Sequence, residues 1–458
     1  MISPILLDRA TMGFSLAVHI FLVSFGISLP VVIGASEFIG IRYGDKYYKA
    51  LARRLTTALL IFFAIGTASG TVVALELLLL WPKFMALVGS VDILPLYIEV
   101  FAFFTEAIFL ATYAYSWDKI RNQYYHFLLI IPIMLGSIGS GILITLLNSF
   151  MNTPAGFNIS EYLSSGTITG VNPIAALFPP SAIYEDSHGV GGTILAGLVM
   201  VMAYFVYKQY KSSGEACNYY KKATKLLLGI SSVIAAFVIY TGVYSIEMLY
   251  YVQPEKYAAF EGDIVPTTHA AEMLFGLFIN GKWTDYISIP NLQSFLATGS
   301  ASGLVPGLSQ FPTYTWPPLF VHDMFDFMVL LGFLLGIILL ITDLVLIIGK
   351  YSNRFGKVAI IGRISKWDVW HSKWTVVFAA LSGALALVLM EVGWVMEELG
   401  RQPWIIYGVM LVSQAGNVST SILPIMIAII VFYAAILPFT LIYINRHFRA
   451  KPVEAELQ

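Results

Sequence analysis

The stretch that decides the fold is VHDMFDFMVLLGFLLGIILLITDLVLIIG, residues 321–349. It is apolar over nearly its whole length and contains neither Lys nor Arg. A helix needs about 20 such residues to cross the hydrocarbon core of a membrane, and this stretch exceeds that length. It therefore predicts a transmembrane helix and not the core of a water-soluble domain.

Eight further stretches share this composition and length, and none contains Lys or Arg. With the first, the candidate spans are residues 11–37, 56–81, 93–117, 127–150, 188–207, 226–250, 321–349, 374–398 and 420–445. The whole chain is 58% hydrophobic and only 12% charged, which is typical of a membrane protein. We expect an all-α integral membrane protein in which residues 1–458 form a single bundle of nine transmembrane helices.

The basic residues predict the orientation of the bundle. Of the 26 Lys and Arg residues, 21 lie in alternate connections, namely 38–55, 118–126, 208–225, 350–373 and the tail after Asn445. Because positive residues accumulate on the cytoplasmic side, we expect the N-terminus outside, the C-terminus in the cytoplasm and a multi-pass location in the cell membrane. Residues 251–320 then form a long extracytoplasmic loop, rich in Pro, Gly, Ser and Thr.

The net charge and the cysteine content argue against several other kinds of partner and site. The net charge of -1 argues against a nucleic acid partner. The single cysteine, Cys217, excludes an intramolecular disulfide framework and a Cys-clustered metal site.

Ionisable residues inside the spans are the main functional signal. Each costs at least a few kcal/mol at membrane depth, so it marks a function by default. The ionisable residues are His19, Glu76, Glu99, Glu106, His188, Glu247, Glu391, Glu397 and Glu398. Met328 is added to them as a possible soft ligand. With the orientation above, several of them fall toward the outer side of the membrane although they come from different helices.

Histidine, methionine and carboxylate on separate apolar helices favour haem over zinc or an iron–sulfur cluster. Haem needs one or two axial ligands in a large apolar cavity, and a thioether opposite an imidazole gives a six-coordinate, electron-transferring iron. Taken singly, a buried histidine is more often a hydrogen-bonded core residue. Methionine is a common core filler. The shared depth of several such groups is what favours a haem site.

Glu99 and Glu106 are separated by seven residues, so on a helix they share a face about 10 Å apart. Such a pair either passes protons inward from the outer site or packs helices as protonated acids. His126 lies on the inner side and is either an entrance for protons or an ordinary interfacial histidine.

Several motifs resemble the large subunit of cytochrome bd quinol oxidases, and the resemblance covers most of the chain. The most specific is GRQPW, residues 400–404, which follows an acid-bearing helix. The others are RATMGFSLAVHI (9–20), YIEVFAFFTEAIFLATYAYSWDKI (97–120), LLNSFMNTPAGF (146–157) and QPEKYAAFE (253–261). Any one of them alone is a weak signal, but the combination is strong.

The resemblance implies roles for individual residues. His188 and Met328 would ligate a low-spin haem b, and His19, Glu99 and Glu398 would build a site with two further haems. Glu398 corresponds to the ligand of a high-spin haem b, with Trp394 beside it, and the remaining haem is either haem d or a third haem b. Arg401 would pair with a haem propionate. Asn148 is the polar position near the haems, and Lys256 and Glu261 are the charged residues of the quinol-binding loop, 251–320.

The implied activity is that of a terminal quinol oxidase of the respiratory chain, an iron-binding oxidoreductase. Membrane quinol would be oxidised at the outer loop and O2 reduced to water. Protons would come from the cytoplasm, with Glu106 and Asn148 as stations, and the proton gradient would arise without pumping. The resemblance also implies a second, related membrane subunit and allows a small single-helix subunit.

The chain departs from the family pattern at two places. VALELLLLW, residues 73–81, stands where the family usually has EFQFG and an asparagine, and Asp326 replaces an arginine two residues before the haem-ligating methionine. The quinol loop is of the short type. These differences leave open the haem at the oxygen site and the type of quinone.

Two other functions fit parts of this pattern. A haem b electron-transfer paralogue would keep the ligands without reducing O2. A secondary transporter would use the intramembrane acids instead, although transporters usually show paired halves and we find no repeat.

Overall fold

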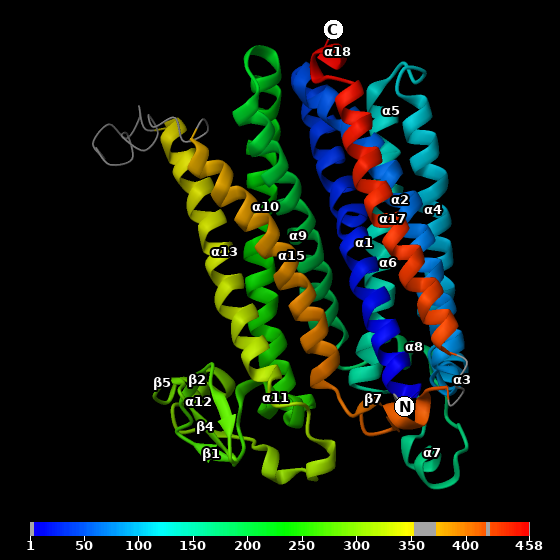
Figure 1. Ribbon diagram of the computed structural model, residues 1–458, viewed down its shortest axis with the longest axis vertical. Coiled ribbons are helices and arrows are strands. Elements are labelled where there is room, and N and C mark those ends of the chain that lie inside the picture. The colour runs from blue at the N-terminus through cyan, green and yellow to red at the C-terminus, as the bar shows by residue number, and fades with distance from the viewer. Residues whose placement is uncertain (1–3, 352–371, 418–421, 458) are drawn as a thin grey trace.

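The computed structural model describes residues 4–351, 372–417 and 422–457, and long helices running side by side dominate it (Figure 1). Within these residues, nine helical segments are long and apolar enough to cross a membrane, which confirms the predicted number. They are α1 (Pro4–Tyr43), α2 (Lys46–Leu80), α4 (Leu94–Ser116), α5 with α6 (Gln123–Leu128 and Ile130–Asn152), α9 (Ala182–Lys211), α10 (Gly214–Val252), α13 (Val321–Tyr351), α15 (Lys373–Gly400) and α17 (Ile422–Ala450). Most of the predicted connection 350–373 and the start of the span 420–445 lie outside the described residues.

Several helices extend past the apolar stretches that predicted them. Helix α10 begins at Gly214, twelve residues before the predicted span, and includes Lys221, Lys222 and Lys225. A helix satisfies its backbone hydrogen bonds internally. Lysine is also a good helix former, so the helix continues beyond the apolar stretch into the polar region.

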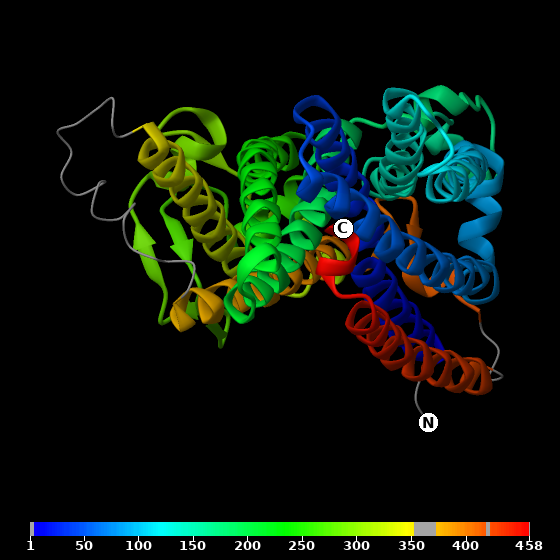
Figure 2. The same ribbon diagram turned by 90° about the horizontal axis from the view of Figure 1, so that it is seen from above.

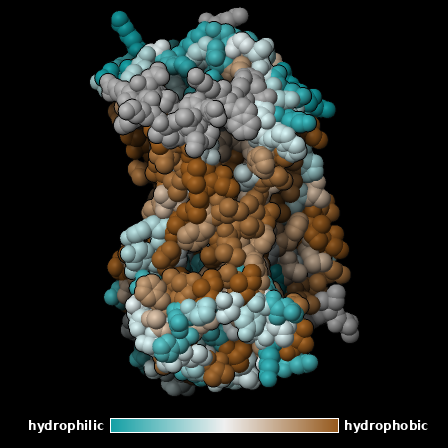
Figure 3. Space-filling view, turned by 90° about the vertical axis from the view of Figure 1, so that its left-hand side faces the viewer, coloured by the Kyte–Doolittle hydropathy of each residue, from teal (hydrophilic) through white to brown (hydrophobic). Residues whose placement is uncertain are grey.

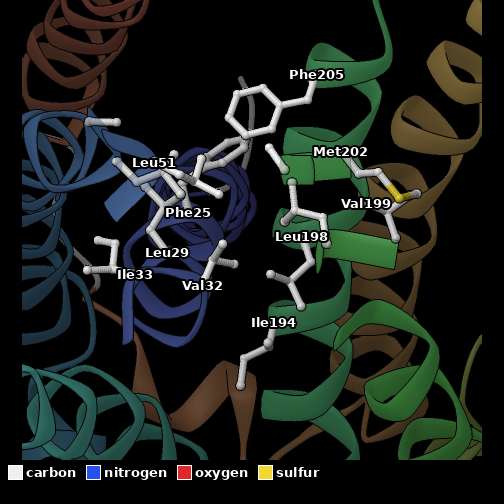
Figure 4. Close-up of a cluster of buried hydrophobic side chains, with 14 of the residues drawn as sticks. Phe25, Leu29, Val32, Ile33, Leu51, Ile194, Leu198, Val199, Met202 and Phe205 are labelled. Carbon is white, nitrogen blue, oxygen red and sulfur yellow. The ribbon is translucent and has the colours of Figure 1, made fainter. Parts of the chain in front are cut away.

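The helices form two groups that meet along α1 and α9. Helices α9, α10, α13 and α15 contact one another on one side, and α1, α2, α4, α6 and α17 form the other side (Figures 1 and 2). Figure 4 shows the apolar core between the groups, where Phe25 and Val32 of α1 face Leu198 and Phe205 of α9.

A glycine sets the close approach of the two groups. A Cβ atom added at Gly197 of α9 would lie 2.4 Å from the Ser24 carbonyl oxygen of α1 and 2.4 Å from Ser28 Oγ. Small residues let helix backbones approach closely in membranes, where van der Waals packing supplies much of the association energy.

The end of the bundle that carries the N-terminus, which we call the loop end, holds most of the shorter elements (Figure 1). Its helices are α3 (Pro82–Val91), α7 (Ile159–Ser165), α8 (Pro173–Leu177), α11 (Pro254–Glu261), α12 (Leu292–Thr298) and α16 (Val412–Ala415). Four antiparallel strand pairs accompany them: β1–β6 (Thr267–Thr268, Leu304–Val305), β2–β5 (Glu272–Leu274, Ile287–Ile289), β3–β4 (Leu277–Ile279, Lys282–Thr284) and β7–β8 (Trp404–Ile406, Met410–Leu411).

Residues 254–315 are therefore a folded module and not an irregular loop. The β3–β4 hairpin turns at Asn280 and Gly281, which both have positive φ, the backbone that a two-residue hairpin turn requires. Helix α11 is buried from Glu255 to Glu261. The module contains two short 3₁₀ turns, Leu308–Gln310 and Thr313–Thr315.

The opposite end, which we call the tail end, carries α5 and the C-terminal helix α18 (Val453–Leu457). Arg54 of α2 holds the C-terminal segment by donating to the carbonyl oxygens of Lys451 (2.8 Å) and Phe448 (3.1 Å) and to Glu456 (3.1 Å). Between the two ends, Figure 3 shows a broad hydrophobic band on the side of the bundle. This band is the surface that a membrane would cover.

Candidate functional site

His19 projects from α1 against α2. Its Nδ1 atom lies 2.8 Å from Ser69 Oγ, and a Cβ atom on the next residue, Gly70, would be 3.1 Å from the His19 ring. The missing side chain at Gly70 therefore lets the imidazole lie flat against α2. With Nδ1 bonded to the hydroxyl, Nε2 is the nitrogen placed to bind iron.

His188 of α9 repeats this arrangement against α10. Its Nδ1 lies 3.1 Å from the Val238 carbonyl oxygen, and a Cβ at Gly242 would be 2.8 Å from the ring. Because a carbonyl only accepts, Nδ1 is assigned as the protonated nitrogen, which leaves the lone pair of Nε2 for a metal.

Met328 and Trp394 lie close to His188 through glycine contacts. A Cβ on Gly189, the residue after His188, would be 3.7 Å from the Trp394 ring of α15. A Cβ on Gly393, the residue before Trp394, would be 3.2 Å from the sulfur of Met328 in α13. Helices α9, α13 and α15 thus place Trp394 beside the residue that follows His188, and Met328 beside the residue that precedes Trp394.

Glu99 and Glu106 both face α6 from α4. Glu99 accepts a 3.0 Å hydrogen bond from Ser140, and a Cβ on Gly136, one turn earlier in α6, would lie 3.0 Å from the Glu106 Cβ. Gly136 thus allows α4 and α6 to approach closely at Glu106. Glu99 is half-buried, whereas Glu106 is buried.

Arg401 lies at the end of α15 and is only 2% exposed. It donates to Asn148 (2.7 Å) and Asn152 (3.0 Å) of α6 and forms an ion pair with Glu398, whose side chain is 40% exposed. Asn148 and Arg401, both predicted site residues, are therefore direct partners.

Asn152 connects this group to the folded module of residues 254–315. Its side-chain amide donates to Glu397 (2.8 Å) and Glu185 (3.1 Å), and its backbone oxygen accepts from Gln253 (2.8 Å). Lys256 of α11 forms an ion pair with Glu397 and is 1% exposed. We call this connected set of residues, some buried and some half-buried, the outer polar network: Asn148, Asn152, Glu185, Lys256, Glu397, Glu398 and Arg401.

Two members of the outer polar network have no role in the sequence analysis, Asn152 and Glu185. Asn152 stands one helical turn after Asn148, and Glu185 stands one turn before His188, so each shares a helix face with a predicted site residue. That spacing is the signal that could have found them.

Lys256 and Glu261 come from the same helix but do not pair with each other. Lys256 reaches α15, whereas Glu261 lies near other acids, Asp263, Glu272 and Asp326. Burial and these neighbouring carboxylates raise the pKa of Glu261 well above its ordinary value. Burial likewise raises the pKa of Asp263 to about 8 and that of Glu272 to about 7.

The two departures from the family pattern occupy defined places. Asp326 is 2% exposed, accepts from the backbone N–H of Phe275 and lies 3.5 Å from His322 Nε2, so it attaches the module to the start of α13. Glu76 is 1% exposed and accepts from Ser15, one turn from His19 on α1.

This donor set fits haem. His19 and His188 each use Nδ1 for a neighbouring helix, which leaves Nε2 as a donor, and Met328 would supply a thioether. Arg401 Nε is buried and has no hydrogen-bond partner within the described ranges, so the guanidinium keeps a donor for an anion such as a propionate. No group of three or more His, Cys, Asp or Glu residues among those described could hold a bare metal ion.

Comparison with known proteins places these observations in a family. Residues 7–452 match the family model described as cytochrome bd terminal oxidase subunit I. The chain is 32% identical to the putative cytochrome bd menaquinol oxidase subunit I of Bacillus subtilis (strain 168), over 99% of this chain and 98% of that protein. It is 25% identical to a cytochrome bd ubiquinol oxidase subunit 1 of the same organism, over 94% and 90% of the two chains.

A solved structure is similar over nearly the full length. The bd oxidase from Geobacillus thermodenitrificans superimposes with a TM-score of 0.88 at 32% identity, covering 98% of this chain and 99% of that one.

Proposed function

We infer that this chain, which belongs to the cytochrome bd terminal oxidase subunit I family, is the haem-bearing subunit of a complex that oxidises membrane quinol and reduces O2 to water. Membership of an oxidoreductase family excludes the transporter interpretation. The observation that carries the proposal is the match of residues 7–452 to this family, and the placing of Met328 beside Gly393 and of Trp394 beside Gly189 supports it.

Each ligand candidate has a proposed place. His188 and Met328 hold a low-spin haem b, and His19, Glu99 and Glu398 are the ligands of the two-haem oxygen site, which contains a high-spin haem b and either haem d or a third haem b. Bound haem supplies the electron transfer and the oxygen chemistry. The chain supplies the orientation of both imidazoles through Ser69 and Val238.

The outer polar network places charged side chains next to these proposed ligands. Arg401 lies beside Glu398 and offers its guanidinium to a propionate, and Asn148 holds the guanidinium in place. Lys256 and Glu261, both on α11, form the quinol site within the loop of residues 251–320. The 32% identical relative is named a menaquinol oxidase, so menaquinol is the first quinol to test.

Protons for O2 reduction travel from the cytoplasmic side through Glu106 to Glu99, and quinol releases its protons outside. This route generates a proton gradient without pumping. It requires the orientation indicated by the basic residues, with the tail end in the cytoplasm. A related second membrane subunit completes the complex, and the family resemblance also allows a small single-helix subunit.

The decisive experiment is a dithionite-reduced absorption spectrum of the purified complex, with and without CO, combined with haem extraction and quinol-driven O2 consumption. A red-shifted chlorin band that moves with CO establishes haem d at an open oxygen site. Only b-type bands, some of them CO-reactive, mean the same site built with haem b. Haem without any CO response or O2 consumption would support the electron-transfer paralogue, which the altered stretch around Glu76 favours.

A further inference from the structure

The folded module of residues 254–315 exposes a set of large apolar side chains around its β2–β5 and β3–β4 pairs, which we call the apolar rim. Its members are between 38% and 63% exposed: Phe275, Leu277, Ile279, Tyr286, Ile287 and Ile289. Single exposed apolar residues are ordinary, but several that adjoin one another mark a contact surface.

Strand pairing and one glycine contact make the apolar rim continuous. Ile287 of β5 pairs with Leu274 of β2, the residue before Phe275. A Cβ atom added at Gly276 would lie 3.3 Å from the Cβ of Tyr286, so the two turns touch. All three residues of β5 are exposed, and among the described residues this strand pairs with β2 alone. The apolar rim is therefore one surface built from neighbouring segments.

The β3–β4 hairpin has one covered face and one open face. The ring of Phe278 lies 5.1 Å from that of Trp283, which in turn lies 4.9 Å from the ring of His322 at the start of α13. Because side chains alternate along a strand, Leu277 and Ile279 point away from this contact. The covered face attaches the hairpin to the helices, and the open face belongs to the apolar rim.

A hydrogen bond fixes the depth of the apolar rim. The backbone N–H of Phe275 donates to Asp326, which lies five residues into the candidate membrane span Val321–Ile348 of α13. At about 1.5 Å per residue, Asp326 is about 8 Å along the helix axis from the first residue of that span. Phe275 therefore lies beside α13 at a level where the span has already begun.

The module projects sideways from the bundle at this level. In Figure 1, β2 and β5 form the side of the module nearest to the long helices, and β1 lies farthest from them. Figures 1 and 2 both show the strands displaced outward from the start of α13. Figure 3 faces this side, and its hydrophobic residues continue from the band to the upper edge of the loop end. The apolar rim is thus placed over the lipid that would surround α13.

The polar residues beside the apolar rim favour lipid as its occupant. Tyr286 adds a hydroxyl to its apolar ring, and Lys282 and Asp285 are exposed next to it. Tyrosine gathers at the boundary between hydrocarbon and headgroups, and lysine can lay its apolar stem along that boundary. Amphipathic elements that lie on a membrane bury their apolar face by about 5–10 Å, which agrees with the depth of Phe275.

We propose that the apolar rim inserts into the loop-end leaflet of the membrane, where Phe275, Leu277 and Ile287 contact phospholipid acyl chains. Lys282 then reaches the headgroups. The bilayer covers this surface, and not the second subunit or a second copy of the chain. Insertion also holds the module, with α11, against the phase in which quinol dissolves. Only this consequence rests on the proposed function, and the contact with lipid does not.

Spin labelling of the purified complex, with all its subunits, in phosphatidylcholine–phosphatidylglycerol nanodiscs tests the contact. In a Cys217→Ser background, a nitroxide is attached at Leu277→Cys or Ile287→Cys, and the signal of the background complex is subtracted. Collisions of the nitroxide with O2, which concentrates in hydrocarbon, are compared with collisions with a water-soluble nickel chelate. We expect the O2-to-nickel ratio at both positions to be several-fold higher than at Ser300→Cys and to approach that at Ile341→Cys.

Ser300→Cys and Ile341→Cys are the matched controls for water and for lipid. Ser300 is exposed in the same module just after α12, and Ile341 is exposed on α13. A ratio at Leu277→Cys and Ile287→Cys equal to that at Ser300→Cys would overturn the proposal. Low collision rates with both reagents would overturn it too, since a protein partner would then cover the apolar rim. A Tm equal to that of the Cys217→Ser complex checks that each labelled variant is folded.

This test is independent of the oxidase proposal. If the complex binds no haem or oxidises no quinol, the oxidase proposal fails, and the collision ratios still decide whether the apolar rim contacts lipid. If the complex is active and the ratios match water, only the contact with lipid fails.

Discussion

At the scale of single residues, the candidate site depends on groups that are expensive to bury. Apolar helices hold His19, His188 and Glu99 where desolvation disfavours charge, so each of these residues needs a partner. Every one has a partner on a neighbouring helix, Ser69, Val238 and Ser140 respectively. These bonds orient the side chains, which makes the consequences of single substitutions specific.

His188→Ala should remove the low-spin haem while part of the oxygen-reactive haem remains. The reason is that His188 supplies one of two proposed axial ligands of that haem alone. The reduced absorption spectrum of the purified complex measures the loss. His269→Ala, at an exposed position of the module, is the control and should leave the spectrum unchanged. An intact low-spin band in His188→Ala would contradict the ligand assignment.

Lys256→Ala should raise the KM for quinol with little spectral change and should also lower the stability of the complex. It leaves the Glu397 carboxylate without its ion-pair partner in a buried site, which costs about 3 kcal/mol. Thermal unfolding and quinol titration measure the two effects.

The double variant Lys256→Gln with Glu397→Gln separates binding from stability. Because neither residue is charged, the stability should return toward the wild-type value while the KM for quinol stays high. A KM that returns together with the stability would remove Lys256 from the quinol site.

At the scale of elements, glycines decide how the helices approach. Gly70 and Gly242 make room for the two histidine rings, and Gly136 lets α6 contact α4 at Glu106. The position of each functional side chain therefore depends on a residue that has no side chain, on a different helix.

Gly197→Ala should destabilise the contact between α1 and α9. The added Cβ would lie 2.4 Å from the backbone oxygen of Ser24, so the helices must separate, at a cost of about 1–3 kcal/mol. Thermal unfolding should show a lower Tm. Gly192→Ala, on the same helix with nothing within 4 Å of the added atom, should match the wild type. Equal Tm values for the two variants would contradict this account of the packing.

The folded module of residues 254–315 should lose stability as the pH rises from about 4 to 8. Asp263 and Glu272 have raised pKa values in the folded module, about 8 and about 7, so the folded state binds more protons than the unfolded state in that range. Stability is then fully present below the unfolded pKa values and falls as pH passes through the folded ones. Hydrogen exchange of residues 254–315 measures it.

Asp263→Asn should flatten this pH dependence, because the amide resembles the protonated acid and can still accept from Gln293. A module that becomes more stable with rising pH would show that the burial of these acids has been assigned incorrectly.

At the scale of the whole molecule, the two ends differ in charge and in structure. The tail end carries most of the basic residues, and the loop end carries the module and the outer polar network. In the proposed reaction, quinol is oxidised at the loop end and protons enter at the tail end. The difference between the ends therefore sets the direction in which charge crosses the membrane.

Cysteine labelling in intact cells tests the orientation. In a Cys217→Ser background, Ser300→Cys lies at the loop end and Ser213→Cys at the tail end, both at exposed positions. A membrane-impermeant thiol reagent should label the first variant in intact cells and the second only after permeabilisation. The reverse pattern would invert the proton route.

Much of the fold was predictable from the sequence, because each span is a local property. About 20 apolar residues without Lys or Arg must become a helix in a membrane, whatever the rest of the chain does. Helix ends were less predictable, as α10 shows, because a helix can continue past the apolar segment. The folded module at 254–315 was not predicted, since its short strands have little hydrophobic periodicity.

For the candidate site, the sequence could suggest some of the residues but not which of them contact one another. His19, Glu99 and Met328 stand out because ionisable or soft groups are conspicuous in apolar helices. Asn152 did not stand out, because a neutral polar residue near a helix end is ordinary. Lys256 and Glu397 are separated by 141 positions, so no local pattern could pair them.

The sequence by itself determined the membrane class and the number of candidate spans, because these follow from composition and helix length. Only the tertiary structure decided which side chains meet. Glu397 pairs with Lys256, Arg401 with Glu398, and Glu37 with His126. Such pairs depend on the rotation and register of packed helices, which are set by contacts such as Gly197 against Ser24 and not by any local property of the chain.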